Sequence, residues 1–119
     1  MDIPLRFTLP VLFLLAVPAT AQELLTPDPI RQPESVVEIQ LQSLQKNDVP
    51  IPDTGIAQTW AFAHPDNKRV TGPLERFAWM IKGPDYRNML DHQEHIIKPV
   101  VQTDDYALFA VTIITADDQ

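Results

Sequence analysis

The stretch that decides the fold runs from Trp60 to Leu90 and reads WAFAHPDNKRVTGPLERFAWMIKGPDYRNML. It holds both tryptophans of the chain and two Gly-Pro dipeptides. Because glycine and proline interrupt regular structure, this stretch predicts short helices separated by turns. Apolar residues within it recur at helical spacing and predict a buried stripe, formed by Leu74, Phe77, Ala78 and Ile81.

Turn and cap residues divide this stretch further. His64-Pro65-Asp66-Asn67 is a turn by composition. Lys68 and Arg69 are interpreted as part of a solvated loop, with an anion-binding role as the alternative. Thr71-Gly72-Pro73 predicts a helix entrance, with threonine or glycine as the cap and proline at the first helical position. Gly83-Pro84 should end that helix, and Asp85 should cap one further turn.

Length and charge limit the function classes. The chain has 119 residues, no cysteine and a formal net charge of −7, which suits one small, acidic domain. Without cysteine there is no disulfide, thiolate metal site or thiol nucleophile. A nucleic-acid partner is not expected, because phosphate binding needs a basic surface. No cofactor is predicted.

Residues 1–21 have the layout of a cleaved signal peptide. Arg6 precedes an apolar core, and the small residues Ala19-Thr20-Ala21 favour cleavage before Gln22. An N-terminal membrane anchor is the alternative, but the apolar run contains Pro10 and is shorter than the roughly 20 residues of a span. We therefore expect an exported protein, periplasmic or secreted, with no stable membrane span after cleavage.

Two helices should precede the central stretch. Residues 22–33 are a proline-rich connector, interpreted as an extended arm that leads to a single domain over residues 34–119. The first helix should begin at Pro33 and end near Asn47. Its buried face is expected to carry Val37, Leu41 and Leu44, and its polar side Glu38, Gln42, Gln45 and Lys46. After the prolines of residues 49–52, a second helix should be capped by Asp53 or Thr54 and end before His64-Pro65.

Strands are expected in the last part of the chain. Residues 95–98 and 100–102 are rich in β-branched side chains, with Pro99 marking an edge, a bulge or a short break. Residues 103–105 form a turn, and residues 106–115 form the best strand, which is apolar on both faces. Residues 116–119 are interpreted as the start of another hairpin turn. An exposed apolar strand edge predicts either a C-terminally truncated domain or a homodimer that pairs through this edge.

The run Phe62-Ala63-His64-Pro65-x-Asn67-x-x-x-Thr71-Gly72-Pro73-x-x-Arg76-Phe77 resembles the signature of a bacterial and plant family, domain of unknown function 4864. The helix VVEIQLQSLQKND is also similar to that family's opening helix, and His64 stands where most relatives carry serine. The resemblance implies an α+β fold related to the cone-like fold of nuclear transport factor two and the SnoaL-like polyketide cyclases. N-terminal helices would then pack on a curved antiparallel sheet, here without its C-terminal strands. The family implies no activity.

Three sets of residues are candidates for a site. For proton transfer next to a carbonyl, as in cone-fold isomerases and dehydratases, they are His64, Asp66 and His92. For a small apolar ligand, they are Trp60, Trp79 and Tyr86, with core packing as the alternative. His92 and His95 are spaced by three, but in an extended chain they would point to opposite sides, so no metal site is predicted.

No recognisable catalytic constellation emerges from these residues. The leading interpretation is a non-catalytic module that binds a small ligand or another protein. The alternative is a cone-fold acid/base enzyme of the isomerase or dehydratase type. A cavity containing a buried histidine or carboxylate would favour the enzyme, and a filled interior with an exposed apolar edge would favour an interaction role.

Overall fold

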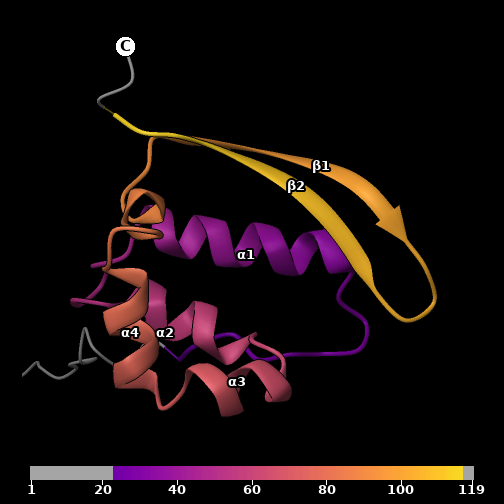
Figure 1. Ribbon diagram of the computed structural model, residues 1–119, viewed down its shortest axis with the longest axis horizontal. Coiled ribbons are helices and arrows are strands. Elements are labelled where there is room, and N and C mark those ends of the chain that lie inside the picture. The colour runs from indigo at the N-terminus through magenta and orange to yellow at the C-terminus, as the bar shows by residue number, and fades with distance from the viewer. Residues whose placement is uncertain (1–22, 117–119) are drawn as a thin grey trace, which may run out of the picture.

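The computed structural model describes residues 23–116, so the predicted signal peptide and the residues after Ala116 lie outside the described part. The elements are α1 (Pro33–Gln45), α2 (Thr54–Ala61), α3 (Pro65–Thr71), α4 (Leu74–Ile81), the 3-10 helix η2 (Arg87–Met89), β1 (Glu94–Gln102) and β2 (Ala107–Ile114). The two strands pair antiparallel and lie along one side of α1, while α2, α3 and α4 lie on its other side (Figure 1). The predicted α+β class is confirmed.

Helix α1 forms as its sequence predicts. Pro33 occupies the first turn and Glu34 lies near the positive helix end. Leu41 and Leu44 are buried, which confirms the predicted face. The predicted polar side is not wholly turned to solvent, because Glu38 and Gln45 both bond to residues at the start of the hairpin.

The start of α2 corrects the predicted cap. Asp53 occupies the cap position, but its side chain makes no cap hydrogen bond. The buried side chain of Asn47 caps α2 instead, because its Oδ1 accepts a hydrogen bond from the backbone N–H of Ile56 at 2.8 Å. Gly55 permits this contact between α1 and α2, because a Cβ at that position would lie 2.0 Å from the carbonyl oxygen of Ser43.

Helix α3 replaces the turn that composition predicts. His64 has an extended backbone, as a residue before proline prefers, and that geometry also suits the cap of a new helix. Its Nδ1 accepts from the backbone N–H of Asp66 at 3.0 Å, and Pro65 fills the first turn. Lys68 and Arg69 therefore lie on a helix, and the solvated-loop interpretation is wrong.

The next two boundaries also shift. Gly72 ends α3, where a Cβ would lie 2.6 Å from the Trp60 ring, and Pro73 occupies the cap of α4 rather than its first position. Pro73 has an extended backbone, so helical hydrogen bonding begins one residue later than predicted. The turn after Gly83-Pro84 is the 3-10 helix η2, and Tyr86, not Asp85, occupies its cap.

The core lies between α1, α2 and α4. Its buried members come from all three helices and comprise Leu44, Ile56, Phe77 and Ile81. The Trp60 ring packs at 5.1 Å from the Phe77 ring, and Leu74 and Ala78 cover the cluster as the predicted stripe requires. The core is small, so hydrogen bonds between elements matter for how the domain is held together.

The hairpin is one continuous ladder with an irregularity between Pro99 and Val101, which confirms a bulge at the predicted proline. Alternation places His95 and Ile97 toward the helices and Ile96 on the opposite face. Among the described residues the sheet has two strands.

Candidate functional site

A chain of hydrogen bonds fastens the hairpin to the helical layer. His92 Nδ1 lies 2.7 Å from the carbonyl oxygen of Met89, and His92 Nε2 lies 2.8 Å from His95 Nδ1. His95 Nε2 then lies 3.0 and 3.1 Å from the two carboxylate oxygens of Glu38. We call Glu38, His95 and His92 the imidazole chain. It joins α1, β1 and the corner after η2.

A tight backbone corner brings the two histidines together. Asp91 has φ of 58°, and its N–H donates to the carbonyl oxygen of Leu44 at 2.9 Å. On the other side of the corner, Gln45 Nε2 donates to the carbonyl oxygen of Gln93 at 2.7 Å. His92 therefore lies in a turn, and β1 begins only at Glu94. The expectation that His92 and His95 point to opposite sides is wrong, because it assumed an extended chain.

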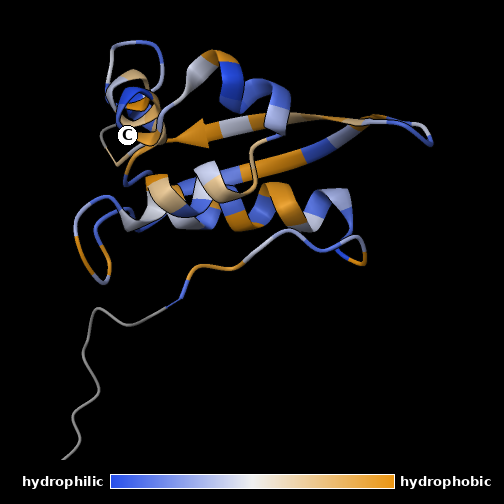
Figure 2. Cartoon of the chain, turned by 90° about the horizontal axis from the view of Figure 1, so that it is seen from below, coloured by the Kyte–Doolittle hydropathy of each residue, from blue (hydrophilic) through white to orange (hydrophobic). Residues whose placement is uncertain are grey.

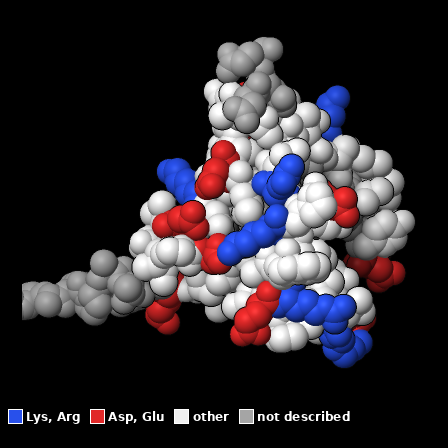
Figure 3. All heavy atoms as spheres, turned by 60° about the vertical axis from the view of Figure 1, so that its left-hand side comes forward, with Lys and Arg blue, Asp and Glu red and all other residues white. Residues whose placement is uncertain are grey.

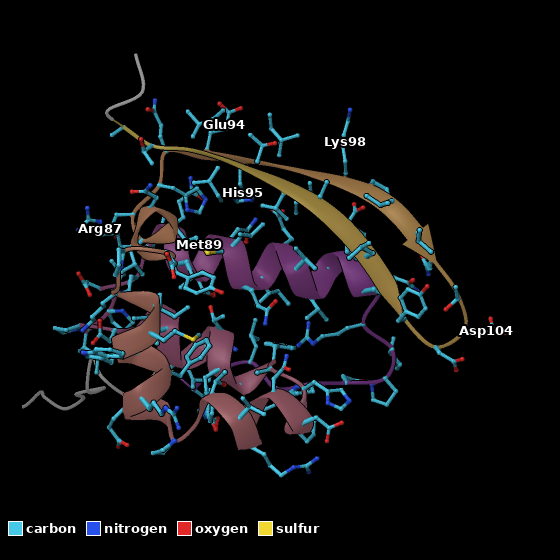
Figure 4. All side chains as sticks on the ribbon, in the orientation of Figure 1. Arg87, Met89, Glu94, His95, Lys98 and Asp104 are labelled. Atoms are coloured by element: carbon cyan, nitrogen blue, oxygen red, sulfur yellow. The ribbon has the colours of Figure 1, made fainter. Side chains whose placement is uncertain are left out.

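Burial increases along the imidazole chain from Glu38 to His92. The Glu38 side chain is 39% exposed and that of His95 is 9% exposed, while His92 is 3% exposed as a residue. The hydrogen bond from His95 holds the pKa of Glu38 below its ordinary value of 4.5, with Gln42 donating a further bond at 2.9 Å. His95 lies on the side of β1 that faces α1, whereas Glu94 and Lys98 lie on the opposite side (Figure 4).

Both nitrogens of both rings are occupied within the imidazole chain. A general base needs a nitrogen within hydrogen-bond reach of the substrate proton. In this arrangement the carboxylate of Glu38 is the one partly exposed end. The geometry therefore suits the holding of a proton inside the protein better than its transfer to a substrate.

Sequence reasoning missed Glu38. It stands on the polar side of α1 by periodicity, and its partner His95 is 57 positions away in the sequence. No local pattern in the sequence marks that pair. The spacing of His92 and His95 did indicate that these two rings could meet. The corner that brings them together depends on the positive φ of Asp91, which the sequence does not reveal.

The structure does not bring the three predicted catalytic residues together. His64 and Asp66 lie at the start of α3, both strongly exposed, with His64 Nδ1 3.7 Å from Asp66 Oδ2. Asp66 also pairs with Arg69, one turn later on the same helix. His92 belongs to the imidazole chain on the hairpin side of α1. Capping and a surface ion pair account for the first two residues.

The three predicted ligand-binding aromatics are also separate. Trp60 packs on the core, and the Trp79 residue is 79% exposed. Tyr86 lines an open depression of about 510 Å³, together with His64, Phe62 and Phe77. That depression is the place where a sequence candidate for catalysis and one for ligand binding meet, but Trp60 and Trp79 do not line it.

A second depression, of about 390 Å³, lies where the N-terminal arm crosses α1 and α2. The buried Gln58 holds the arm there. Its Oε1 accepts from the N–H of Leu25 at 2.7 Å, and its Nε2 donates to the carbonyl oxygen of Leu25 at 2.9 Å. The predicted connector has no helix or strand over residues 23–28, and it is docked on the domain at Leu25. Neither this depression nor that beside Tyr86 is lined by His92 or His95.

The outward face of the hairpin is uncovered among the described residues and carries exposed apolar side chains beside the charged Glu94 and Lys98. Ile96, Val101 and Leu108 are 45%, 40% and 54% exposed. Figure 2 shows hydrophobic stretches on both strands and a hydrophilic tip. Exposed apolar surface gathered on one element is typical of an interaction surface.

Neither the distribution of surface charge nor the grouping of metal-ligating side chains indicates another site among the described residues. On the face shown in Figure 3, acidic and basic side chains are interspersed and not gathered by sign. Within residues 23–116, no group of three histidine, aspartate or glutamate side chains is arranged to hold a metal. No helix in that same range is long and apolar enough to cross a membrane.

Comparisons of the chain with protein-family models, with curated proteins and with solved structures found no match. The resemblance to domain of unknown function 4864 therefore stays a prediction. We infer function from the geometry of the described residues.

Proposed function

We propose that this protein is an exported, non-catalytic interaction module whose hairpin pairs with an extended strand of a partner protein. The observation that carries this proposal is the free edge of β2. Isolated two-stranded hairpins are marginal in water, and a strand edge presents unpaired backbone groups to any chain that can align with it. Exposed apolar side chains on the outward face beside that edge, such as Leu108 and Ile96, give an added strand side-chain contacts as well.

The edge of β2 suits strand addition better than that of β1. β1 contains Pro99, which has no N–H, and its ladder is irregular between Pro99 and Val101. It also carries Lys98, and lysine on a strand discourages edge pairing. β2 has eight residues with neither proline nor charge. We therefore assign the pairing edge to β2.

Charge favours a basic partner over a second copy of the chain. Asp104 and Asp105 lie exposed at the hairpin tip, and the chain carries a formal net charge of −7. A second copy would bring an equal negative charge, whereas a strand flanked by lysine or arginine would gain attraction and faster encounter. The homodimer stays an outcome of the test.

The test uses a photo-crosslinking residue at Ala110, in the middle of β2, and a matched one at Val100, on the edge of β1. We expect Ala110 to crosslink a partner that is then purified and shown to bind the 119-residue chain. Ala110→Lys should weaken that binding at least tenfold, because a charge is placed on the pairing strand. Val100→Lys should leave binding within about twofold. Sedimentation velocity of the chain alone shows whether it forms a homodimer.

Two outcomes would refute the interaction proposal. One is a chain that stays monomeric and crosslinks nothing through Ala110. The other is binding that Val100→Lys weakens as much as Ala110→Lys does.

The finer fold and the location belong to the same proposal. The family resemblance implies a cone-like sheet, and the alternative occupant of the β2 edge is then a further antiparallel strand of the same protein. A longer reading frame that supplies those strands would support this arrangement. Export through the predicted signal peptide, to the periplasm or the medium, predicts a mature chain that begins at Gln22. N-terminal sequencing of the natural protein checks the cleavage site.

The second candidate function is an acid/base enzyme, and the observation that favours it is the imidazole chain. Buried histidines paired with a carboxylate are typical of proton-transfer sites. We rank it below the interaction module, because the rings present no free nitrogen. An enzyme would exchange the α-protons of a small carbonyl compound for deuterium and lose this activity in His95→Gln. The small-ligand interpretation rests on the two depressions, and native mass spectrometry of the natural protein would detect a retained apolar ligand.

A further inference from the structure

The geometry of the imidazole chain fixes how many protons it needs for all of its hydrogen bonds to form. It has three links in series: Met89 to His92, His92 to His95, and His95 to Glu38. Each hydrogen bond needs one proton between its two heavy atoms. Two neutral imidazoles carry only two N–H groups, and an ionised carboxylate carries none. The chain is therefore fully bonded only when it holds a third proton.

The position of each proton follows from the ends of the chain. The carbonyl oxygen of Met89 can only accept, so His92 Nδ1 carries a proton. The carboxylate of Glu38 accepts at the other end, so His95 Nε2 carries another. Placing the middle proton on His95 Nδ1 puts the resulting positive charge directly beside the carboxylate, which Coulomb attraction favours. The lowered pKa of Glu38 agrees with a proton held on the ring and not on the carboxyl group.

We propose that Glu38, His95 and His92 form a proton-gated latch that fastens the hairpin to α1 and closes fully only in the three-proton state. Removing the third proton leaves one link with two facing lone pairs. A fourth proton places two N–H groups opposite each other at the link between His92 and His95, which are 2.8 Å apart. Opening of the hairpin should therefore be smallest at intermediate pH and should increase on either side.

The other charged groups around the latch do not offset this count. On α1, Glu34 and Lys46 are exposed, on η2, Arg87 is exposed, and at the corner, Asp91 is exposed. On β1, Glu94 and Lys98 lie on the face away from α1, and β2 carries no charge (Figure 4). No contact of any of these side chains with His92 or His95 is found among the described residues. Within residues 23–116, Glu38 is the one charged side chain that is hydrogen-bonded to either ring.

The consequence for partner binding rests on the proposed function. If a partner strand pairs with β2, the latch sets the position of that strand against α1. Because the latch closes fully only with its third proton bound, the position of that strand would depend on pH. The latch itself can be tested without any partner.

Glu38→Gln is the informative variant. A glutamine amide can donate its own N–H to His95 Nε2, so all three links form with two neutral imidazoles and no third proton. The latch should then stay closed as the pH rises. Glu34→Gln is the matched control, since it removes the same charge from the same helix one turn earlier, at an exposed position.

The experiment is amide hydrogen exchange in the 119-residue chain, measured at the alternate β1 amides that point to β2 and divided by exchange at the buried Ile56 of α2. This ratio cancels the general increase of exchange with pH. From about pH 6 to pH 8, we expect the ratio to rise about tenfold in the wild type and in Glu34→Gln. Tenfold is the low end for a bond to a charged group, because Glu38 is partly exposed. In Glu38→Gln the ratio should change less than twofold.

Nitrogen-15 spectra of the histidine rings supply an independent count. At about pH 6 they should show one neutral ring protonated at Nδ1 and one doubly protonated ring. Two neutral rings at that pH, a flat exchange ratio in the wild type, or the same rise in Glu38→Gln would overturn the latch. A failed crosslink at Ala110 with the exchange ratio behaving as expected would overturn the proposed function alone.

Discussion

At the residue scale, Glu38 gives the domain a specific acid sensitivity. The hydrogen bond from His95 lowers its pKa from the ordinary value of 4.5. The unfolded chain therefore binds a proton at a higher pH than the folded chain, and stability rises with pH between those two values. The Glu38 contribution is complete above about pH 4.5 and is lost as the pH falls through the folded pKa. As the pH is lowered from about 6 to about 3, the urea midpoint of unfolding should fall more in the wild type than in Glu38→Gln.

The same midpoints measured in Glu34→Gln control for the loss of one α1 charge. That variant should follow the wild type, since Glu34 is exposed and has no partner among the described hydrogen bonds and ion pairs. Equal acid sensitivity of the wild type and Glu38→Gln would contradict the role given to the His95 contact. Asp53, whose pKa is lowered by its hydrogen bond with Lys82, supplies a common background of acid sensitivity in all three proteins.

Single residues were the least predictable level. Asn47 is polar and stands at the end of a helix, so its sequence context suggests solvent, yet it is 3% exposed and caps α2. Asp53 stands where a cap is expected, but its carboxylate accepts from Asn47 and from Lys82, 29 positions away. Glu38 likewise bonds to a residue that is distant in the sequence, His95. Each of these roles depends on a partner that only the folded chain brings near.

At the scale of elements, the contact between α1 and α2 depends on Gly55. A Cβ there would lie 2.0 Å from the carbonyl oxygen of Ser43 and 2.8 Å from the Cα of Asn47, both backbone atoms. Gly55→Ala must therefore push α2 away from α1 and should destabilise the domain by about 1–3 kcal/mol. Gly83→Ala is the comparison with a milder contact, because its Cβ would lie 3.2 Å from the nearest outside atom, the carbonyl oxygen of Met80, and should cost less than Gly55→Ala. Urea denaturation measures both, and equal stabilities would contradict the close approach.

Docking of the N-terminal arm depends on Gln58. Its amide makes two hydrogen bonds to the backbone of Leu25, so Gln58→Leu removes both while keeping a side chain of similar size. The N–H of Leu25 should then lose about tenfold of its protection from hydrogen exchange, the equivalent of about one net hydrogen bond. Helix content measured by circular dichroism should not change. Unchanged protection of Leu25 would mean that other contacts hold the arm.

Element prediction succeeded where local chemistry and periodicity agree. Pro33 and the spacing of Leu41 and Leu44 were enough for α1, and the apolar run between acidic turns was enough for β2. The prediction was wrong at α3. The dipeptide His64-Pro65 ends one helix and starts the next, and composition alone cannot distinguish that arrangement from a turn.

At the scale of the whole molecule, α1 is shared by two layers. Its Leu44 belongs to the small helical core, and Glu38 reaches the hairpin on the other side. The sequence predicted an α+β domain, but it did not predict that polar contacts would fasten the sheet. A strand that is apolar on both faces gives no indication of which face meets the helices. The bulge after Pro99 and the corner at Asp91 set that orientation in the folded chain.

The orientation of the hairpin can be tested with two neighbouring residues. Ile96 faces outward and is 45% exposed, while Ile97 faces α1 and is half-buried. Ile96→Lys should change the free energy of unfolding by no more than about 0.5 kcal/mol, as surface substitutions usually do. Ile97→Lys places an ammonium group against the helical layer, where it has to leave the contact or lose water, and should cost about 2 kcal/mol or more. The two variants share one substitution, one strand and adjacent positions, so differences in charge or in β-propensity cancel. If the order were reversed, the face assigned to the partner strand would be the one that packs on α1, and both the latch and the interaction surface would need to be reassigned.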